Sequence, residues 1–226
     1  MTDPTRTHIA FLLDRSGSMQ SIKTDTEGGF DAFIAEQRTQ PGECTVTLAQ
    51  FDDKYEVVYE SLAIKEVPPL RLNPRGMTAL LDSIARLVND TGARLAALPE
   101  HERPGTVIVG IMTDGLENAS REWTHAAVKA LIEQQESVYD WTFSYLGANQ
   151  DAIEVGASIG ISRDRSLTYD QGNVEAAMGA YSQSISTNRA SRAKGLSGQE
   201  ARAAAAYTED QRHASTSHTR KKRRVI

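Results

Sequence analysis

The chain has 226 residues, of which 39% are hydrophobic and 24% charged, a composition typical of a globular protein with one sizeable core and an appendage. No apolar run approaches the roughly 20 residues that a membrane-spanning helix requires, and the first residues lack the layout of a secretory signal. The net charge of −5 divides unevenly: from Arg189 onward there are ten lysines and arginines against three acids, so the first 188 residues carry −12, which disfavours nucleic-acid binding by the body.

Short apolar runs alternate with segments of helical periodicity through most of the chain. Strands are expected at 8–14, 44–51, 55–64, 106–112, 141–147 and 166–169. Helices are expected around 30–37, 80–95, 128–132, 151–158 and 174–185. Only three residues separate 44–51 from 55–64, too few for a crossover, so these two strands should pair antiparallel. The other strands alternate with helices, which predicts an α/β fold with a largely parallel sheet and helices on both faces.

The apolar periodicity stops near residue 189. The remaining stretch has almost no large apolar residues and includes five consecutive basic residues, Arg220 to Arg224. Such a composition cannot offset its ordering entropy by burial. We therefore expect a domain over residues 1–188 and a flexible basic tail over 189–226. The tail could contact nucleic acid or an acidic membrane, but a solvated tail is the simpler interpretation.

The cysteine count bears on the cellular location. Cys44 is the one cysteine of the chain, so an intrachain disulfide is excluded and a cytoplasmic location is favoured. Its setting in an apolar-alternating run indicates a buried small hydrophobic residue rather than a reactive thiol.

Three polar loops follow the expected elements in a suggestive way. Asp14, Ser16 and Ser18 come directly after the first strand, Thr78 precedes the second helix, and Asp114 follows the strand at 106–112. In open parallel sheets, ligands bind beyond the carboxyl ends of the strands. All five side chains offer oxygen, which hard divalent cations prefer. Two carboxylates among five ligands would only just neutralise such a cation, so it could still recruit an anionic oxygen from another molecule.

The motifs DRSGS at 14–18, GMT at 76–78 and TDG at 113–115 resemble the metal-ion-dependent adhesion site of von Willebrand factor type A (vWA) domains, and the chain is similar to intracellular bacterial members. The resemblance covers about residues 8–186. It implies a doubly wound (Rossmann-like), mostly parallel sheet with one short antiparallel edge strand. It also implies Mg²⁺ or Mn²⁺ held by Asp14, Ser16, Ser18, Thr78 and Asp114. A partner protein would complete the coordination with a carboxylate.

We therefore expect a non-catalytic, divalent-cation-dependent protein-binding module of the adhesion type. Met77 departs from the family pattern, in which a second glycine is common. Each loop alone could be structural, because serine and threonine cap helices and aspartate occurs in turns. Residues on the same loops are candidates for partner selectivity: Arg15, Met77, Glu117, Asn118 and Trp123.

Two enzyme alternatives and one structural alternative remain. GASIG at 156–160 matches the G-x-S-x-G of a hydrolase nucleophile elbow, but that motif needs a strand before the serine, and Ser158 follows a helix-like segment. Phosphatase chemistry through an aspartyl phosphate at Asp14 would normally need a second carboxylate two positions on, where this chain has Ser16. The structural alternative is a scaffold with a vestigial metal site, which would not respond to metal.

Overall fold

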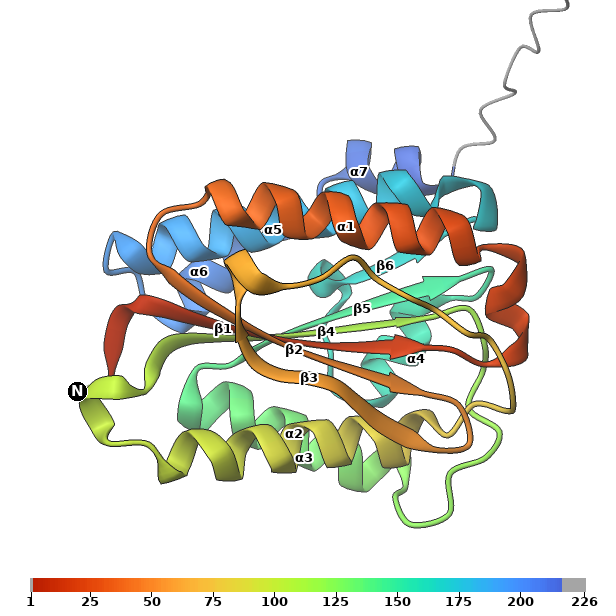
Figure 1. Ribbon diagram of the computed structural model, residues 1–226, viewed down its shortest axis with the longest axis horizontal. Helices are drawn as coiled ribbons and strands as arrows, with labels where there is room; N and C mark the ends of the chain where they lie inside the picture. The colour runs from red at the N-terminus through yellow and green to blue at the C-terminus, as the bar shows by residue number, and fades with distance from the viewer. Residues whose placement is uncertain (1, 217–226) are drawn as a thin grey trace, which may run out of the picture.

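A six-stranded sheet separates two helical layers in the computed structural model, which describes residues 2–216 (Figure 1). The strands are β1 (Asp3–Asp14), β2 (Glu43–Phe51), β3 (Tyr55–Ala63), β4 (Pro104–Thr113), β5 (Thr142–Ala148) and β6 (Ser166–Tyr169). Their order in the sheet is β3-β2-β1-β4-β5-β6. All neighbouring strands are parallel except β2 and β3, which form the antiparallel edge. The predicted α/β fold is therefore confirmed.

The helices cover both faces of this sheet (Figure 1). One layer contains α1 (Lys23–Thr39) and α5 (Val174–Ala193), against which α6 (Gly198–Ala204) and α7 (Glu209–Thr216) pack. The other contains α2 (Leu80–Ala97), α3 (His125–Tyr139) and α4 (Ala152–Ser158). Short 3₁₀ helices are η1 (Gly17–Ser21), η2 (Ile64–Glu66), η3 (Glu100–Glu102), η4 (Arg163–Arg165) and η5 (Gln171–Asn173). Within residues 2–216, no helix is both long enough and apolar enough to span a membrane.

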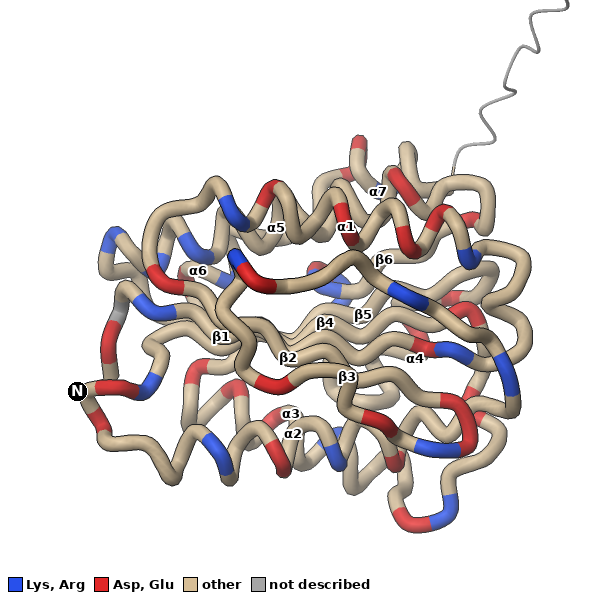
Figure 2. The backbone as a smooth tube through the Cα atoms, in the orientation of Figure 1, with Lys and Arg blue, Asp and Glu red and all other residues tan. Residues whose placement is uncertain are grey.

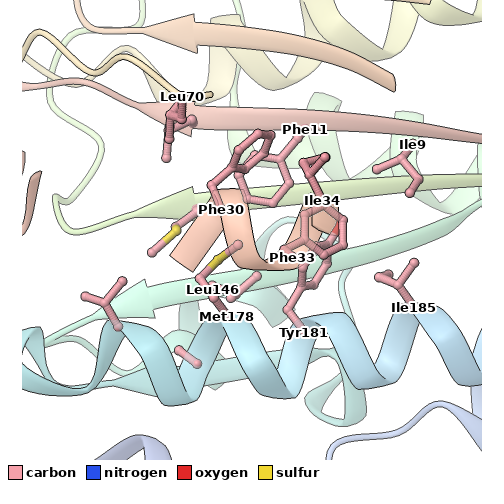
Figure 3. Close-up of a cluster of buried hydrophobic side chains, with 14 of the residues drawn as sticks. Ile9, Phe11, Phe30, Phe33, Ile34, Leu70, Leu146, Met178, Tyr181 and Ile185 are labelled. Carbon is pink, nitrogen blue, oxygen red and sulfur yellow. The ribbon is translucent and has the colours of Figure 1, made fainter. Parts of the chain in front are cut away.

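Aromatic side chains fill the core between the sheet and the α1–α5 layer (Figure 3). The ring of Phe11 on β1 lies 5.3 Å from that of Phe30 and 5.5 Å from that of Tyr181, measured between centroids. Phe33 lies 5.0 Å from Tyr181 and so links α1 to α5. Ala10 and Leu12, the residues that alternate with Phe11, pack into the second core on the opposite face. Residues 9–13 of β1 are continuously apolar because they are buried on both faces of the sheet, which holds the carboxyl end of the strand firmly.

The chain leaves the two central strands in opposite directions. After β1 it enters α1 on one face, whereas after β4 it enters α3 on the other. Leu13 pairs with Met112, so the carboxyl ends of β1 and β4 lie side by side while their loops diverge. Ligands of open α/β sheets bind at such a topological switch point. Asp14 ends β1 and Asp114 follows β4, which brings both acids to this point.

Residues 189–216 do not form the flexible tail that their composition predicts. Helix α5 continues past residue 188, and Arg189 is buried, where it donates to the carbonyl oxygens of Gln37 and Pro41. Tyr207 is 5% exposed and belongs to the core, and the Ser184 hydroxyl donates to the carbonyl of Ala205. The prediction failed because this packing depends on alanines, one tyrosine and hydrogen-bonded arginines rather than on large apolar residues. The basic run Arg220–Arg224 lies outside the described residues.

Charges of both signs are mixed along the described part of the chain. Figure 2 shows Lys and Arg interspersed with Asp and Glu over both helical layers and along the loops.

Candidate cation-binding site

The five side chains of interest come from three loops at the carboxyl edge of the sheet, on the right in Figure 1. Asp14, Ser16 and Ser18 lie on the turn from β1 into η1, Thr78 lies two residues before α2, and Asp114 directly follows β4. These side chains are buried or partly buried, except Ser18, which is exposed. The position of these side chains thus follows from the topology.

Hydrogen bonds connect four of the five side chains into one chain of contacts. The Ser18 hydroxyl donates to Asp114 Oδ1 at 2.6 Å, and the hydroxyl oxygens of Ser16 and Ser18 lie 3.1 Å apart. Asp14 Oδ1 accepts from the Ser16 amide at 2.6 Å. Asp14 Oδ2 accepts from the Thr113 hydroxyl, also at 2.6 Å. The turn after β1 and the end of β4 are therefore held together through side-chain oxygens.

Gly115 shows where the fifth side chain joins them. A Cβ placed on Gly115 would lie 2.9 Å from Thr78 Oγ1 and 3.7 Å from both Asp14 Oδ2 and Ser18 Oγ. Oxygens from two loops thus face one small space above Gly115 of the third loop, and we call the space bounded by Asp14, Ser18 and Thr78 the cradle. Any side chain at position 115 would enter it.

The loops that form the cradle are fixed to one another by backbone contacts. The Gly17 amide donates to the Gly76 carbonyl at 3.3 Å, and the Asn118 amide donates to the Thr78 carbonyl at 3.1 Å. The Asn118 side chain returns the contact, because its Oδ1 accepts from the Thr78 amide at 2.9 Å. Gly76 has a φ of 69°, a left-handed conformation that glycine adopts without strain. The cradle is therefore built on a preorganised backbone.

The electrostatics of the cradle favour binding of a cation. Burial raises the pKa of Asp14 to about 6, against hydrogen bonds from Thr113 and Ser16 that lower it, and the Asp114 charge adds a smaller rise. Burial also raises the pKa of Asp114. Among the described residues, Asp114 Oδ2 is buried without a hydrogen-bond partner. Burying a carboxylate oxygen without a partner costs free energy, so binding of a cation or a proton at this atom would be favourable.

The donor set decides which cations fit. All five side chains offer oxygen, the ligand that Mg²⁺ and Mn²⁺ prefer, whereas zinc prefers nitrogen and sulfur. In the described part of the chain, no group of three or more His, Cys, Asp and Glu side chains gathers, which disfavours a site of the zinc type. The residues present therefore fit a hard divalent cation held by two carboxylates and three hydroxyls.

Arg15, a candidate for partner selectivity, is instead engaged within the protein. It is 5% exposed; its Nε lies 3.0 Å from Asp52 Oδ2 and its Nη1 lies 2.6 Å from Glu56 Oε2. Arg75 Nε lies 2.9 Å from the same Asp52 oxygen. Although burial opposes it, hydrogen bonds from Arg75 and Arg15 keep the pKa of Asp52 low. Sequence reasoning missed Asp52, whose position directly after the apolar β2 run was the available signal.

Glu117 and Asn118 also have internal roles. Glu117 accepts from the amides of Leu81, Ala119 and Ser120, which fastens the loop after β4 to the first turn of α2. Asp82 accepts from the amides of residues 121–123 and holds the same loop from the other side. Trp123 is partly buried against the core. Of the selectivity candidates, Met77 is the large side chain left exposed, at 54%; the sequence reasoning did not consider Leu116, which is 62% exposed.

Ser158 lies in a setting unlike a nucleophile elbow. It is the last residue of α4, and its hydroxyl donates to the carbonyl of Val155 one turn earlier. A helix, not a strand, precedes it, whereas an elbow presents its serine on a strand-to-helix turn. GASIG thus corresponds to small residues at a helix end.

Comparison of the sequence with protein-family models and with curated proteins gives no match. Solved structures do match. Proximal thread matrix protein 1 of the mussel byssus aligns with a TM-score of 0.55 at 16% identity, over 78% of this chain and 45% of that one. A structure of the same protein with a zinc-occupied metal-ion-dependent adhesion site (MIDAS) motif gives a TM-score of 0.56 at 16% identity, over 79% of this chain and 47% of that one.

A bacterial structure aligns over nearly its whole length. The von Willebrand factor domain of the type V pili tip protein Mfa5 from Porphyromonas gingivalis has a TM-score of 0.54 at 11% identity, over 80% of this chain and 95% of that one. This chain spans less than half the length of the mussel protein. At such identities the likeness concerns the fold, and it agrees with the sheet order and the antiparallel edge described above. The chain has the fold of von Willebrand factor type A domains.

Proposed function

We propose that this protein is a non-catalytic protein-binding module of the adhesion type, in which a divalent cation at the cradle recruits a carboxylate of a partner protein. The observation that carries the proposal is the buried Asp114 Oδ2, which has no hydrogen-bond partner and belongs to the chain neighbour of Gly115, around which oxygens of Asp14, Ser18 and Thr78 lie. A bound Mg²⁺ or Mn²⁺ would supply two positive charges and a coordination position open to an outside oxygen.

The five side chains would contribute charge and neutral oxygens to the cation site. Asp14 and Asp114 provide two negative charges, enough to balance the cation and no more. Ser16, Ser18 and Thr78 provide neutral oxygens. Ser18 is exposed, so this side of the cradle faces solvent and a partner could approach from there. The charge balance favours a partner acid because the site carries no excess negative charge to repel it.

Other observations support the choice of function class. A zinc-occupied MIDAS motif in the mussel protein supports divalent-cation binding in this fold, although the oxygen-only ligand set here favours Mg²⁺ or Mn²⁺. The Ser158 hydroxyl donates to a carbonyl of its own helix, so Ser158 lacks the setting of a nucleophile. The fully buried Asp14 carboxylate accepts hydrogen bonds from the Thr113 hydroxyl and the Ser16 amide. We also place the protein in the cytoplasm, on the strength of its single buried cysteine, Cys44.

Affinity capture from a lysate of the native host tests the proposal. The full chain should retain at least one protein in millimolar Mg²⁺ and release it in EDTA. Asp114→Asn should retain nothing in either buffer, because the substitution removes one of the two charges that hold the cation. A protein retained equally in EDTA and by the variant would contradict a cation-dependent contact. Hydrolytic turnover that depends on Ser158 would contradict the non-catalytic assignment.

A further inference from the structure

Two large apolar side chains stand exposed directly beside the cradle. Met77, which precedes Thr78, is 54% exposed, and Leu116, which follows Gly115, is 62% exposed. The described residues contain few others of this kind: Val57, Val58, Val138 and Tyr139. Each of the two loops that face one another across the cradle thus carries an apolar side chain next to its cradle residue.

The loops that carry Met77 and Leu116 are bound to each other beside the cradle. Thr78 and Asn118 exchange two hydrogen bonds, of 2.9 and 3.1 Å. Thr78 Oγ1 lies within 2.9 Å of the position that a Cβ on Gly115 would take. Met77 is the chain neighbour of Thr78 and Leu116 is that of Gly115, and we call this exposed apolar pair the margin.

The backbone under this margin is fixed. Glu117, the neighbour of Leu116, binds the amides of Leu81, Ala119 and Ser120, and the Gly76 carbonyl, next to Met77, accepts from Gly17. A side chain presented by a preorganised loop loses little backbone entropy when it is covered by a partner. The unbranched methionine can adapt to the shape of what covers it.

The charge of Glu117 also matters, because a free carboxylate between Leu116 and Asn118 would repel an acidic partner. Its oxygens accept from three backbone amides and from the Ser120 hydroxyl, so the negative charge faces the helix terminus rather than the margin. The margin is therefore apolar beside a site that would attract a carboxylate.

We propose that Met77 and Leu116 select the partner: a protein segment in which the acidic residue has a large aliphatic or aromatic residue as an immediate neighbour. The inference rests on the proposed function, since the acidic residue needs the cation. The apolar neighbour would cover Met77 and Leu116 while the carboxylate reaches the cradle. Neither side chain contributes an oxygen to the cradle, so selection and cation binding should be separable.

Selection of displayed random peptides on the immobilised full chain tests the inference. In Mg²⁺ we expect enrichment of peptides that pair Asp or Glu with an adjacent Leu, Ile, Met, Phe or Trp, and loss of this enrichment in EDTA. Mg²⁺-dependent enrichment of acidic peptides without an apolar neighbour would overturn the selectivity and leave the proposed function standing. Enrichment that ignores Mg²⁺, or no enrichment, would overturn both.

Matched variants locate the contact on the protein. Met77→Ser with Leu116→Ser should weaken binding of the best selected peptide by about tenfold, the loss expected for an interface anchor. Val138→Ser, which alters an equally exposed residue at the far end of α3, should leave the affinity unchanged. All variants should keep the melting shift that Mg²⁺ produces in the wild type. Unchanged peptide affinity in the double variant, or loss of its melting shift, would contradict a selective role.

Discussion

Replacing Asp14 with asparagine should stabilise the cation-free protein at neutral pH. Asp14 is fully buried at the end of β1, and burial raises its pKa from 3.8 to about 6. Between pH 3.8 and about 6, Asp14 is mostly deprotonated in the unfolded chain and mostly protonated in the folded protein. The contribution of Asp14 to stability therefore falls as the pH rises from about 4 to about 6, and stays low above that range.

The shift sets the size of the effect. A rise of about two pKa units at 1.36 kcal/mol each corresponds to about 3 kcal/mol of native-state destabilisation above pH 6. Asparagine removes this charge and keeps an oxygen for the Ser16 amide. The Thr113 hydroxyl, which would lose its acceptor, already lies 3.0 Å from the Gly115 carbonyl and can donate there. The variant should thus gain up to about 3 kcal/mol at neutral pH and little near pH 4.

Urea unfolding in EDTA at several pH values measures this difference. Asp90→Asn, which removes a half-exposed carboxylate from α2, serves as the control and should shift stability by less than about 0.5 kcal/mol. Millimolar Mg²⁺ should stabilise the wild type and leave Asp14→Asn unchanged. A variant less stable than the wild type at every pH in EDTA, or a gap that does not vary with pH, would refute the reasoning.

Three further predictions follow from the burial of single residues. Gly115→Ala should abolish the Mg²⁺-dependent melting shift because its Cβ would lie 2.9 Å from Thr78 Oγ1, whereas Gly28→Ala, with open space around it, should keep the shift. Tyr207→Ala should lower the free energy of unfolding by about 3–5 kcal/mol in urea titrations, while a flexible tail would give no change. Burial, together with the Arg94 charge, lowers the pKa of His8 to about 3, so the free energy of unfolding should fall as the pH drops below 6.5. The loss at pH 5 should be about 2 kcal/mol, and His8→Gln should remove it.

The fold could be predicted because its strands are apolar runs that the sequence shows clearly. The run at 8–14 is nearly continuously apolar, as expected of a strand buried on both faces, and the three-residue turn after Phe51 allows only an antiparallel pair. The doubly wound sheet that the family resemblance implied places the carboxyl ends of β1 and β4 side by side, and with them Asp14 and Asp114. The convergence of five oxygens was therefore accessible from the sequence through the topology and the family resemblance.

What the sequence could not indicate depends on contacts between distant loops. Arg15 and Glu117 read as exposed charges, yet their partners, Asp52 and the amides of α2, lie 37 and 36 residues away. Leu116 carries no periodic signal, and its exposure follows from the fastening of its loop to α2. The helices after residue 189 are packed by alanines and by arginine-to-carbonyl hydrogen bonds, which hydrophobic periodicity does not detect.

A crystal of the full chain soaked in Mn²⁺ tests the central claim most directly, because anomalous scattering locates the ion without assumptions about its ligands. The account predicts one strong anomalous peak in the cradle, within bonding distance of oxygens from Asp14, Ser16, Ser18, Thr78 or Asp114, directly or through water. It also predicts that the peak disappears in Asp114→Asn. A Mn²⁺ peak at another place, or a cradle without a peak at saturating Mn²⁺, would contradict it.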